Sequence, residues 1–235
     1  DSVPGFATPL SQVNAGTAFS LILKNSIDPT PTKVFVQGSG TASTITVTFK
    51  AMSKGDTVTV NGMTLTANKS LSASEVGEMF EKLDTTTTVS VAAGGIEASA
   101  INSVPLATYG TFSGKFATGY SSGANSNGVV VLTSTANNAA DLAAPTGTQF
   151  SNTIAVAASA TTPAGIVATI NSASLGVTAQ LINTGNIATP YRIMVTGASG
   201  VSNAFSLTSL KSGGGEVTSV SFGKTLQAAQ DAAFN

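Results

Sequence analysis

Alternating apolar and polar residues run through most of the chain and predict short β-strands. Residues 45–49 read Ile-Thr-Val-Thr-Phe, so every second side chain can enter a core while threonine faces water. Residues 57–60 and 63–66 alternate in the same way, and the Asn61-Gly62 dipeptide between them is typical of a two-residue hairpin turn. Further strands are expected over 18–23, 33–37, 87–92, 128–134, 152–157, 176–182, 191–196, 203–208 and 216–222.

One segment after residue 71 has helical spacing instead. Ser72 and Glu75 have the S-x-x-E spacing of a capping box. The apolar residues that follow share one helical face, and these are Val76, Met79, Phe80 and Leu83. Because Glu75, Glu78 and Glu81 lie largely off that face, we interpret their carboxylates as helix surface rather than as a catalytic or metal site.

A second helix is expected from Thr162 to about residue 173. Pro163 would occupy its first position, where a missing N–H costs nothing. Its buried stripe would consist of Ile166, Val167 and Ile170.

Strands outnumber helices, so the predicted fold class is strand-dominated α+β. We expect antiparallel sheets with a few short helices packed on one face, arranged as two similar modules. Residues 1–40 are expected to form an N-terminal strand segment that packs with the tail 216–235 as part of an inner β domain. Residues 41–150 read as a β-rich accessory module with one helix, and residues 151–215 as a module of one helix plus strands.

The composition narrows the possible functions. The chain has no His and no Cys, and it carries ten Lys+Arg against eleven Asp+Glu. A Ser-His-Asp triad, a thiolate nucleophile and a cysteine zinc site are therefore excluded. The basic residues form no cluster that could neutralise phosphates, and no apolar run is long enough for a membrane-spanning helix. We therefore expect no enzyme activity, no cofactor, no metal, no nucleic acid partner and no membrane insertion.

A row of aromatic residues stands in the Gly- and Ser-rich region 93–127. Its members are Tyr109, Phe112, Phe116 and Tyr120. Such a row forms either a small core or an exposed platform for a sugar or a neighbouring subunit, and the core is the more common outcome. The four residues are also the candidate interface residues of the sequence.

The second module carries a more specific pattern. Residues 170–183 read INSASLGVTAQLIN and are followed by Tyr-Arg-Ile-Met-Val-Thr at 191–196. Gly176 allows a sharp turn from helix to strand, and Asn171 is suited to holding a turn or capping backbone groups. A further run, TLQAAQDAAF, occupies residues 225–234.

These runs resemble two signatures of the bacterial flagellar filament-cap family, hook-associated protein 2, in that family's order. The first is similar to its flagellin hook IN motif and the second to a signature that follows it. Met194 stands where the family usually has Leu, and the linker 185–190 is longer than usual. The matching positions are Ile170, Asn171, Leu175, Gly176, Val177, Ala179, Asn183, Tyr191, Arg192, Val195, Leu226, Gln227, Asp231 and Phe234.

The resemblance implies a structural protein of the extracellular flagellum tip. It would form a ring-like homo-oligomer, build the outer plate of the cap, and help flagellin subunits insert and polymerise. The family's terminal coiled-coil helices have no counterpart here, so the chain is expected to represent outer domains only. Two alternatives remain open: a surface adhesion module that binds glycans or host surface molecules, and the variable outer domain of a flagellin.

Overall fold

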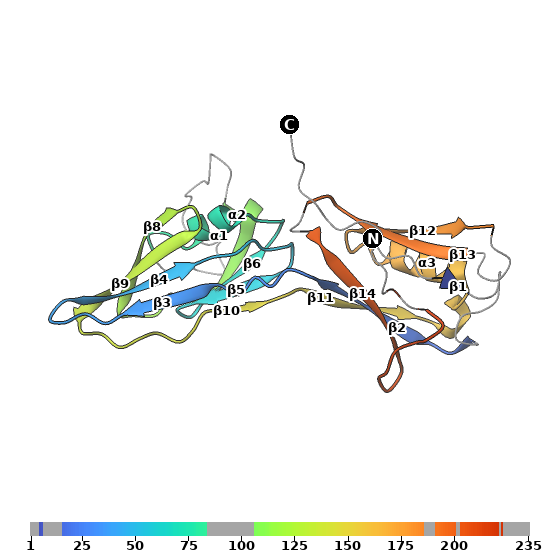
Figure 1. Cartoon of the computed structure of the whole chain (residues 1–235), viewed down its shortest axis with the longest axis horizontal. Coiled ribbons are helices and arrows are strands. Elements are labelled where there is room, and N and C mark those ends of the chain that lie inside the picture. The colour runs from blue at the N-terminus through green and yellow to red at the C-terminus, as the bar shows by residue number, and fades with distance from the viewer. Residues whose placement is uncertain are drawn as a thin grey trace. The chain divides into compact units, whose positions relative to one another are not determined.

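A computed structural model of the chain describes residues 5–6, 16–83, 106–185, 191–200, 203–220 and 222 (Figure 1). The described residues are mainly strands, all paired antiparallel, with a few short helices, so the α+β fold class is confirmed. The chain divides into two compact units. Unit 1 comprises residues 1–26 and 151–235, and unit 2 comprises residues 27–150. Unit 2 is therefore an insertion within the sequence of unit 1.

Unit 2 contains two four-stranded sheets. In one, the order β3-β4-β9-β8 joins Thr32–Val36, Ala42–Thr48, Val129–Asn137 and Tyr120–Ser126. In the other, the order β10-β5-β6-β7 joins Thr146–Thr148, Thr57–Val60, Met63–Ala67 and Gly110–Gly114. The β5–β6 turn contains Asn61 at φ 48° and Gly62 at φ 83°, which confirms the predicted hairpin with positive φ at both central residues.

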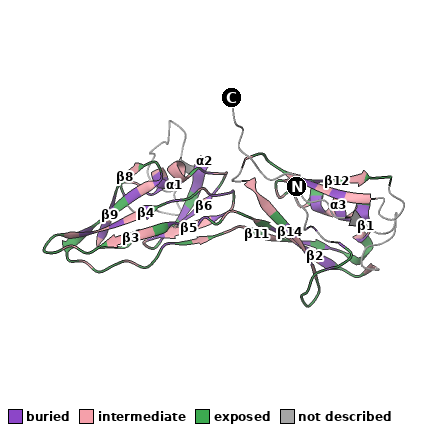
Figure 2. Ribbon diagram, in the orientation of Figure 1, coloured by how far each residue is buried: buried purple, intermediate pink, exposed green. Residues whose placement is uncertain are grey.

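The core of unit 2 lies on the inner side of these sheets and takes in the short helix α1 (Ala73–Met79); a second short helix, α2, spans Leu106–Tyr109. Buried and less buried positions alternate along the strands, as Figure 2 shows. Phe80 stacks on Phe49 at 5.0 Å and meets Phe112 edge-on at 5.5 Å between ring centroids. The capping box is present: Ser72 N donates to Glu75 Oε2 at 2.7 Å and Glu75 N donates to Ser72 Oγ at 3.2 Å.

Unit 1 contains two three-stranded sheets and the helix α3 (Pro163–Ser172). The order β11-β2-β14 joins Ser151–Val156, Phe19–Asn25 and Phe205–Lys211. The order β1-β13-β12 joins Gly5–Phe6, Tyr191–Gly197 and Val177–Asn183, and a short 3₁₀ turn, η3, spans Ala158–Ala160. Thr162 caps α3 by accepting from Gly165 N at 3.1 Å, and Pro163 begins the helix, as the sequence predicts.

The predicted domain boundaries need correction. Residues 27–40 belong to unit 2, because β3 pairs with β4. β2 pairs with β14 and shares a core with residues 151–215, so the predicted inner domain and second module form one unit. The predicted boundary at residue 150 coincides with the division between the units.

The strand predicted over 216–222 is also wrong where the structure describes it. Gly213, Gly214 and Gly215 have φ near 90°, and the chain turns back so that only Glu216 bridges to Leu210. The apolar residues after this turn are spaced unevenly, and they enter the core of unit 1 as Val217, Val220 and Phe222. The strand predicted over 87–92 lies outside the described residues.

Candidate interaction surface

The residues of the IN-like run come together in one local structure of unit 1. Helix α3 buries Ile166 and Ile170 completely, and the β12–β13 hairpin buries Ile193 and Val195 beneath it. Between helix and hairpin, Ser174 at φ 53° and Gly176 at φ 79° reverse the chain. A residue with a Cβ is strained in this left-handed region, so glycine suits position 176.

The side chain of Asn171 joins the helix to the hairpin. Its Nδ2 donates to the Ala179 carbonyl at 3.0 Å, and Ala179 N donates to its Oδ1 at 2.7 Å. β12 is an edge strand of its sheet, so the outward backbone groups of Ala179 have no neighbouring strand. Asn171 therefore satisfies both groups, which confirms the predicted capping role and identifies its partner.

The other residues of the run are also architectural. Leu175, Val177, Leu181 and Tyr191 are half-buried against the core of unit 1. Asn183 is exposed, and its Oδ1 accepts from Gly185 N at 2.9 Å. Arg192 stands opposite Gly5 on one side and Ile182 on the other. The remaining matching positions, Leu226, Gln227, Asp231 and Phe234, lie outside the described residues.

The four candidate interface aromatics are inside unit 2, so their prediction as interface residues is wrong. Tyr109, Phe112, Phe116 and Tyr120 are 3–7% exposed and belong to its hydrophobic core. Phe112 lies in β7 and Tyr120 begins β8, whereas Tyr109 ends α2 and Phe116 lies between the two strands. All four rings enter the core, which was the more common outcome for such a row. No exposed ring among the four remains to serve as a sugar platform.

Polar groups contact both tyrosines of this row. Tyr109 supports Lys69, whose Nζ lies 4.0 Å from the ring centroid. The Tyr120 hydroxyl donates to the Ala140 carbonyl at 2.8 Å. Burial, together with the nearby Asp141 carboxylate, raises the pKa of Tyr120 above its usual value.

The outer side of the β3-β4-β9-β8 sheet carries the hydrophobic surface of unit 2. Among the described residues, the exposed large hydrophobic side chains are Val34, Val36 and Val131, at 62%, 57% and 39%. Strand register sets them among threonines, and we define the Val/Thr face as Val34, Val36, Thr44, Thr46, Val131 and Thr133. The sequence gives a weak signal for this face, because the run 129–132 is apolar at every position and hides which valine points outward.

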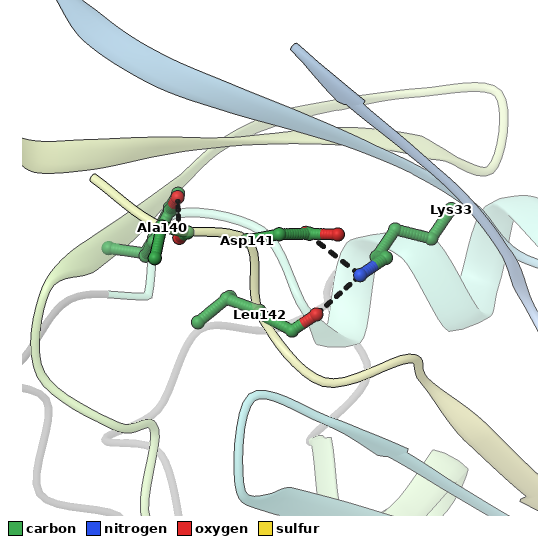
Figure 3. Close-up of polar contacts among 5 residues, drawn as sticks. Lys33, Ala140, Asp141 and Leu142 are labelled. Carbon is green, nitrogen blue, oxygen red and sulfur yellow. Dashed lines mark hydrogen bonds and ion pairs between the residues drawn. The ribbon is translucent and has the colours of Figure 1, made fainter. Parts of the chain in front are cut away.

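An ion pair lies on the inner side of β3, an edge strand of the same sheet (Figure 3). Lys33 Nζ lies 2.8 Å from Asp141 Oδ1 and also donates to the Leu142 carbonyl. The segment that carries these acceptors packs Leu142 against the core. The ion pair therefore fixes β3 to the loop that follows β9.

Several of the carboxylates described in unit 2 accept hydrogen bonds from the protein itself. Asp56 is fully buried and accepts from Ser53 N and Phe150 N, both at 2.8 Å. Glu75 completes the capping box, and Glu81 accepts from Asn125 N at 2.8 Å. No group of three or more His, Cys, Asp or Glu residues able to hold a metal ion occurs in the part of the chain that the structure describes.

Within the described ranges, no helix has the length and apolar character needed to cross a membrane.

Comparison with known proteins gives no further lead. No family model matches the chain, and neither a curated protein nor a solved structure is similar to it at a significant level.

Proposed function

We propose that this chain forms the outer domains of a bacterial flagellar filament cap, a structural protein of the hook-associated protein 2 kind. The observation that carries the proposal is the local structure around Asn171. The IN-like residues occupy one helix and one hairpin, and the amides of Asn171 and Asn183 form hydrogen bonds with backbone groups. This is the behaviour expected of a motif that maintains a fold rather than one that performs chemistry.

A cap of this kind acts through shape and weak contacts. Copies of the chain would form a ring at the distal tip of the extracellular filament, and flagellin subunits would fold and insert beneath the plate. Antiparallel sheets with well-filled cores supply the rigidity that such a plate needs. A surface of uncharged threonines and valines supplies contacts that break easily as each subunit is added.

The test is the position of the protein on the bacterial surface. Gold-labelled antibodies against residues 1–235 should mark one end of each filament and leave its shaft unlabelled. Deletion of the gene should release unpolymerised flagellin into the medium, and expression of the full-length protein should restore filaments.

The same images separate the proposal from its alternatives. Label along the whole filament would identify the variable outer domain of a flagellin. Label away from the filaments, together with unchanged flagellin polymerisation after deletion, would favour an adhesion module. Either pattern contradicts the cap proposal.

A further inference from the structure

The chain enters unit 2 through an aspartate followed by a proline. Unit 2 begins at residue 27, and Asp28-Pro29 is the only Asp-Pro pair in the sequence. Asp28 is exposed, whereas Pro29 is buried. A carboxylate is a nucleophile, and the tertiary amide nitrogen of a proline leaves more readily than an ordinary peptide nitrogen once it takes up a proton. The pair therefore places a nucleophile beside a labile peptide bond.

Thr30 holds the carboxylate of Asp28 over that bond. Thr30 N donates to Asp28 Oδ1 at 3.0 Å, and Thr30 Oγ1 donates to the same oxygen at 2.6 Å. This arrangement is an Asx turn, which folds the side chain forward along the Asp28–Pro29 peptide. Among the described residues, no hydrogen-bond donor reaches Oδ2. One carboxylate oxygen is therefore fixed and the other remains available for attack.

The backbone on both sides of the bond has little conformational freedom. The ring of Pro29 fixes its own φ, and Asp28 and Thr30 each precede a proline, which restricts both to extended conformations. A nucleophile held close to a carbonyl group reacts much faster than a freely rotating one, because the approach costs little further entropy. The local structure therefore favours a reaction within the chain.

We infer that the Asp28–Pro29 peptide bond is a self-cleavage site, at which the Asp28 carboxylate attacks its own main-chain carbonyl carbon in mild acid. A bond forms between Oδ2 and that carbon, the carbon–nitrogen bond breaks, and the Pro29 nitrogen keeps the electron pair and takes up protons from the acidic solvent. One water molecule then opens the cyclic anhydride left on Asp28. The products are residues 1–28 with a free carboxyl end and residues 29–235 with a free amino end.

The charge state of Asp28 suits this reaction. Hydrogen bonds from the hydroxyl and the amide of Thr30, with a smaller contribution from the charge of Lys50, hold the pKa of Asp28 below its usual value. A larger fraction of the carboxylate therefore stays ionised in mild acid, where the solvent supplies protons to the leaving nitrogen. The cleavage rate should rise as the pH falls from 7 into this range.

Cleavage would change how the two units are joined. Strand β2 would stay paired with β11 and β14 and keep Phe19, Leu21 and Leu23 buried, so residues 1–28 would remain bound to unit 1. Unit 2 would then be continuous with unit 1 only at residues 150–151 instead of at both of its ends. This reaction goes beyond the proposed function, because a cap that acts through shape and weak contacts requires no cut in its chain.

Incubation of the full chain at about 37 °C in mild acid tests the inference. The pH used is the lowest at which far-ultraviolet circular dichroism still shows the native spectrum. Denaturing mass spectrometry should detect residues 1–28 and 29–235, whose masses sum to that of the chain plus one water. The same chain unfolded in urea at that pH should be cleaved at least ~10-fold more slowly, because its carboxylate rotates freely.

Substitutions separate the nucleophile from the residue that positions it. Asp28→Asn removes the carboxylate and should lower the rate at least ~10-fold. Thr30→Val keeps the shape of the side chain without its hydroxyl and should slow cleavage at least ~3-fold, whereas Thr30→Ser should retain the wild-type rate.

Three results would overturn the inference. These are a folded chain cut no faster than the unfolded one, an Asp28→Asn or Thr30→Val chain cut as fast as wild type, and a main cut at any other bond. None of these outcomes depends on where the protein lies on the bacterial surface, so the cap proposal stands or fails separately.

Discussion

Asn171 shows how much one side chain contributes to the fold of unit 1. It satisfies both backbone groups of Ala179 at a strand edge. Asn171 is itself exposed and its two hydrogen bonds are part-buried, so water can replace them only partly. We expect Asn171→Ala to lower the free energy of unfolding by about 1 kcal/mol. Urea unfolding of the whole chain measures this change in the transition of unit 1.

Two further variants control that experiment. Asn171→Asp keeps the shape but presents an oxygen to the Ala179 carbonyl, so it should also be destabilising at pH 7. Asn183→Ala removes an exposed amide from the same hairpin and should cost less than about 0.5 kcal/mol. Equal stability of the Asn171→Ala and wild-type chains would show that water replaces the amide without loss.

Sequence reasoning could identify Asn171 as a capping residue, but not its partner. Asparagine after a helical stripe suggests a local turn. That its amide reaches Ala179 depends on the edge position of β12, which is a property of the assembled sheet. For Val131 the sequence gives no such hint. It lies in the run 129–132, which is apolar at every position, so the pattern does not show that its side chain points outward.

At the scale of single elements, α1 carries two glutamates whose pKa values are shifted in opposite directions, Glu75 of the capping box and Glu78. Burial alone would raise the pKa of Glu75, but hydrogen bonds from Ser72 and Lys69 outweigh it and hold the pKa below its usual value. The pKa of Glu78 is raised by burial and by the carboxylates of Glu81 and Glu75. The two carboxylates therefore change stability with pH in opposite directions.

These directions give a matched pair of variants. A lowered folded-state pKa adds stability above the unfolded value, and that stability is lost as pH falls. Glu75→Gln should therefore be less stable than wild type at pH 7 and nearly equal to it at pH 3. Glu78→Gln should be slightly more stable than wild type at pH 7, and the difference should vanish on acidification. Thermal unfolding at pH 3, 5 and 7 measures both, and parallel profiles for the two variants would contradict the argument.

Elements with local signals were predictable, and elements without them were not. The boundaries of α1 and α3 and the Asn61-Gly62 turn follow from capping residues, a proline and a turn dipeptide that act within a few positions. The region 216–222 contains strand-forming residues, but three preceding glycines redirect it into a turn. The burial of the aromatic rings at 109–120 depends in part on the distant strand β6, whose Leu65 stands opposite Phe112 in β7.

At the scale of the whole chain, the division into units could be predicted only in part. The boundary at 150 coincides with a change of sheet, whereas the pairing of β2 with β14 joins residues about 180 positions apart and leaves no local trace. The first strands of the chain therefore belong with its last ones. Because unit 2 enters between β2 and its neighbour β11, removing it should leave the sheets of unit 1 complete.

A deletion of unit 2 tests whether unit 1 folds by itself. Lys24 stands opposite Ser151, so replacing residues 26–150 by one glycine joins the two strands through the two-residue loop Asn25-Gly, with the loss of one pair, Asn25 with Phe205, at the end of β2. This dipeptide favours the type I′ turn that matches the twist of paired strands. The shortened chain should unfold cooperatively and give well-dispersed amide resonances, because its core draws on unit 1 alone. The same deletion with Pro in place of the inserted Gly cannot adopt positive φ and should lose several degrees of thermal stability. A shortened chain that is unfolded with either residue would show that unit 1 needs unit 2 to fold, and the two units would then form a single cooperative system.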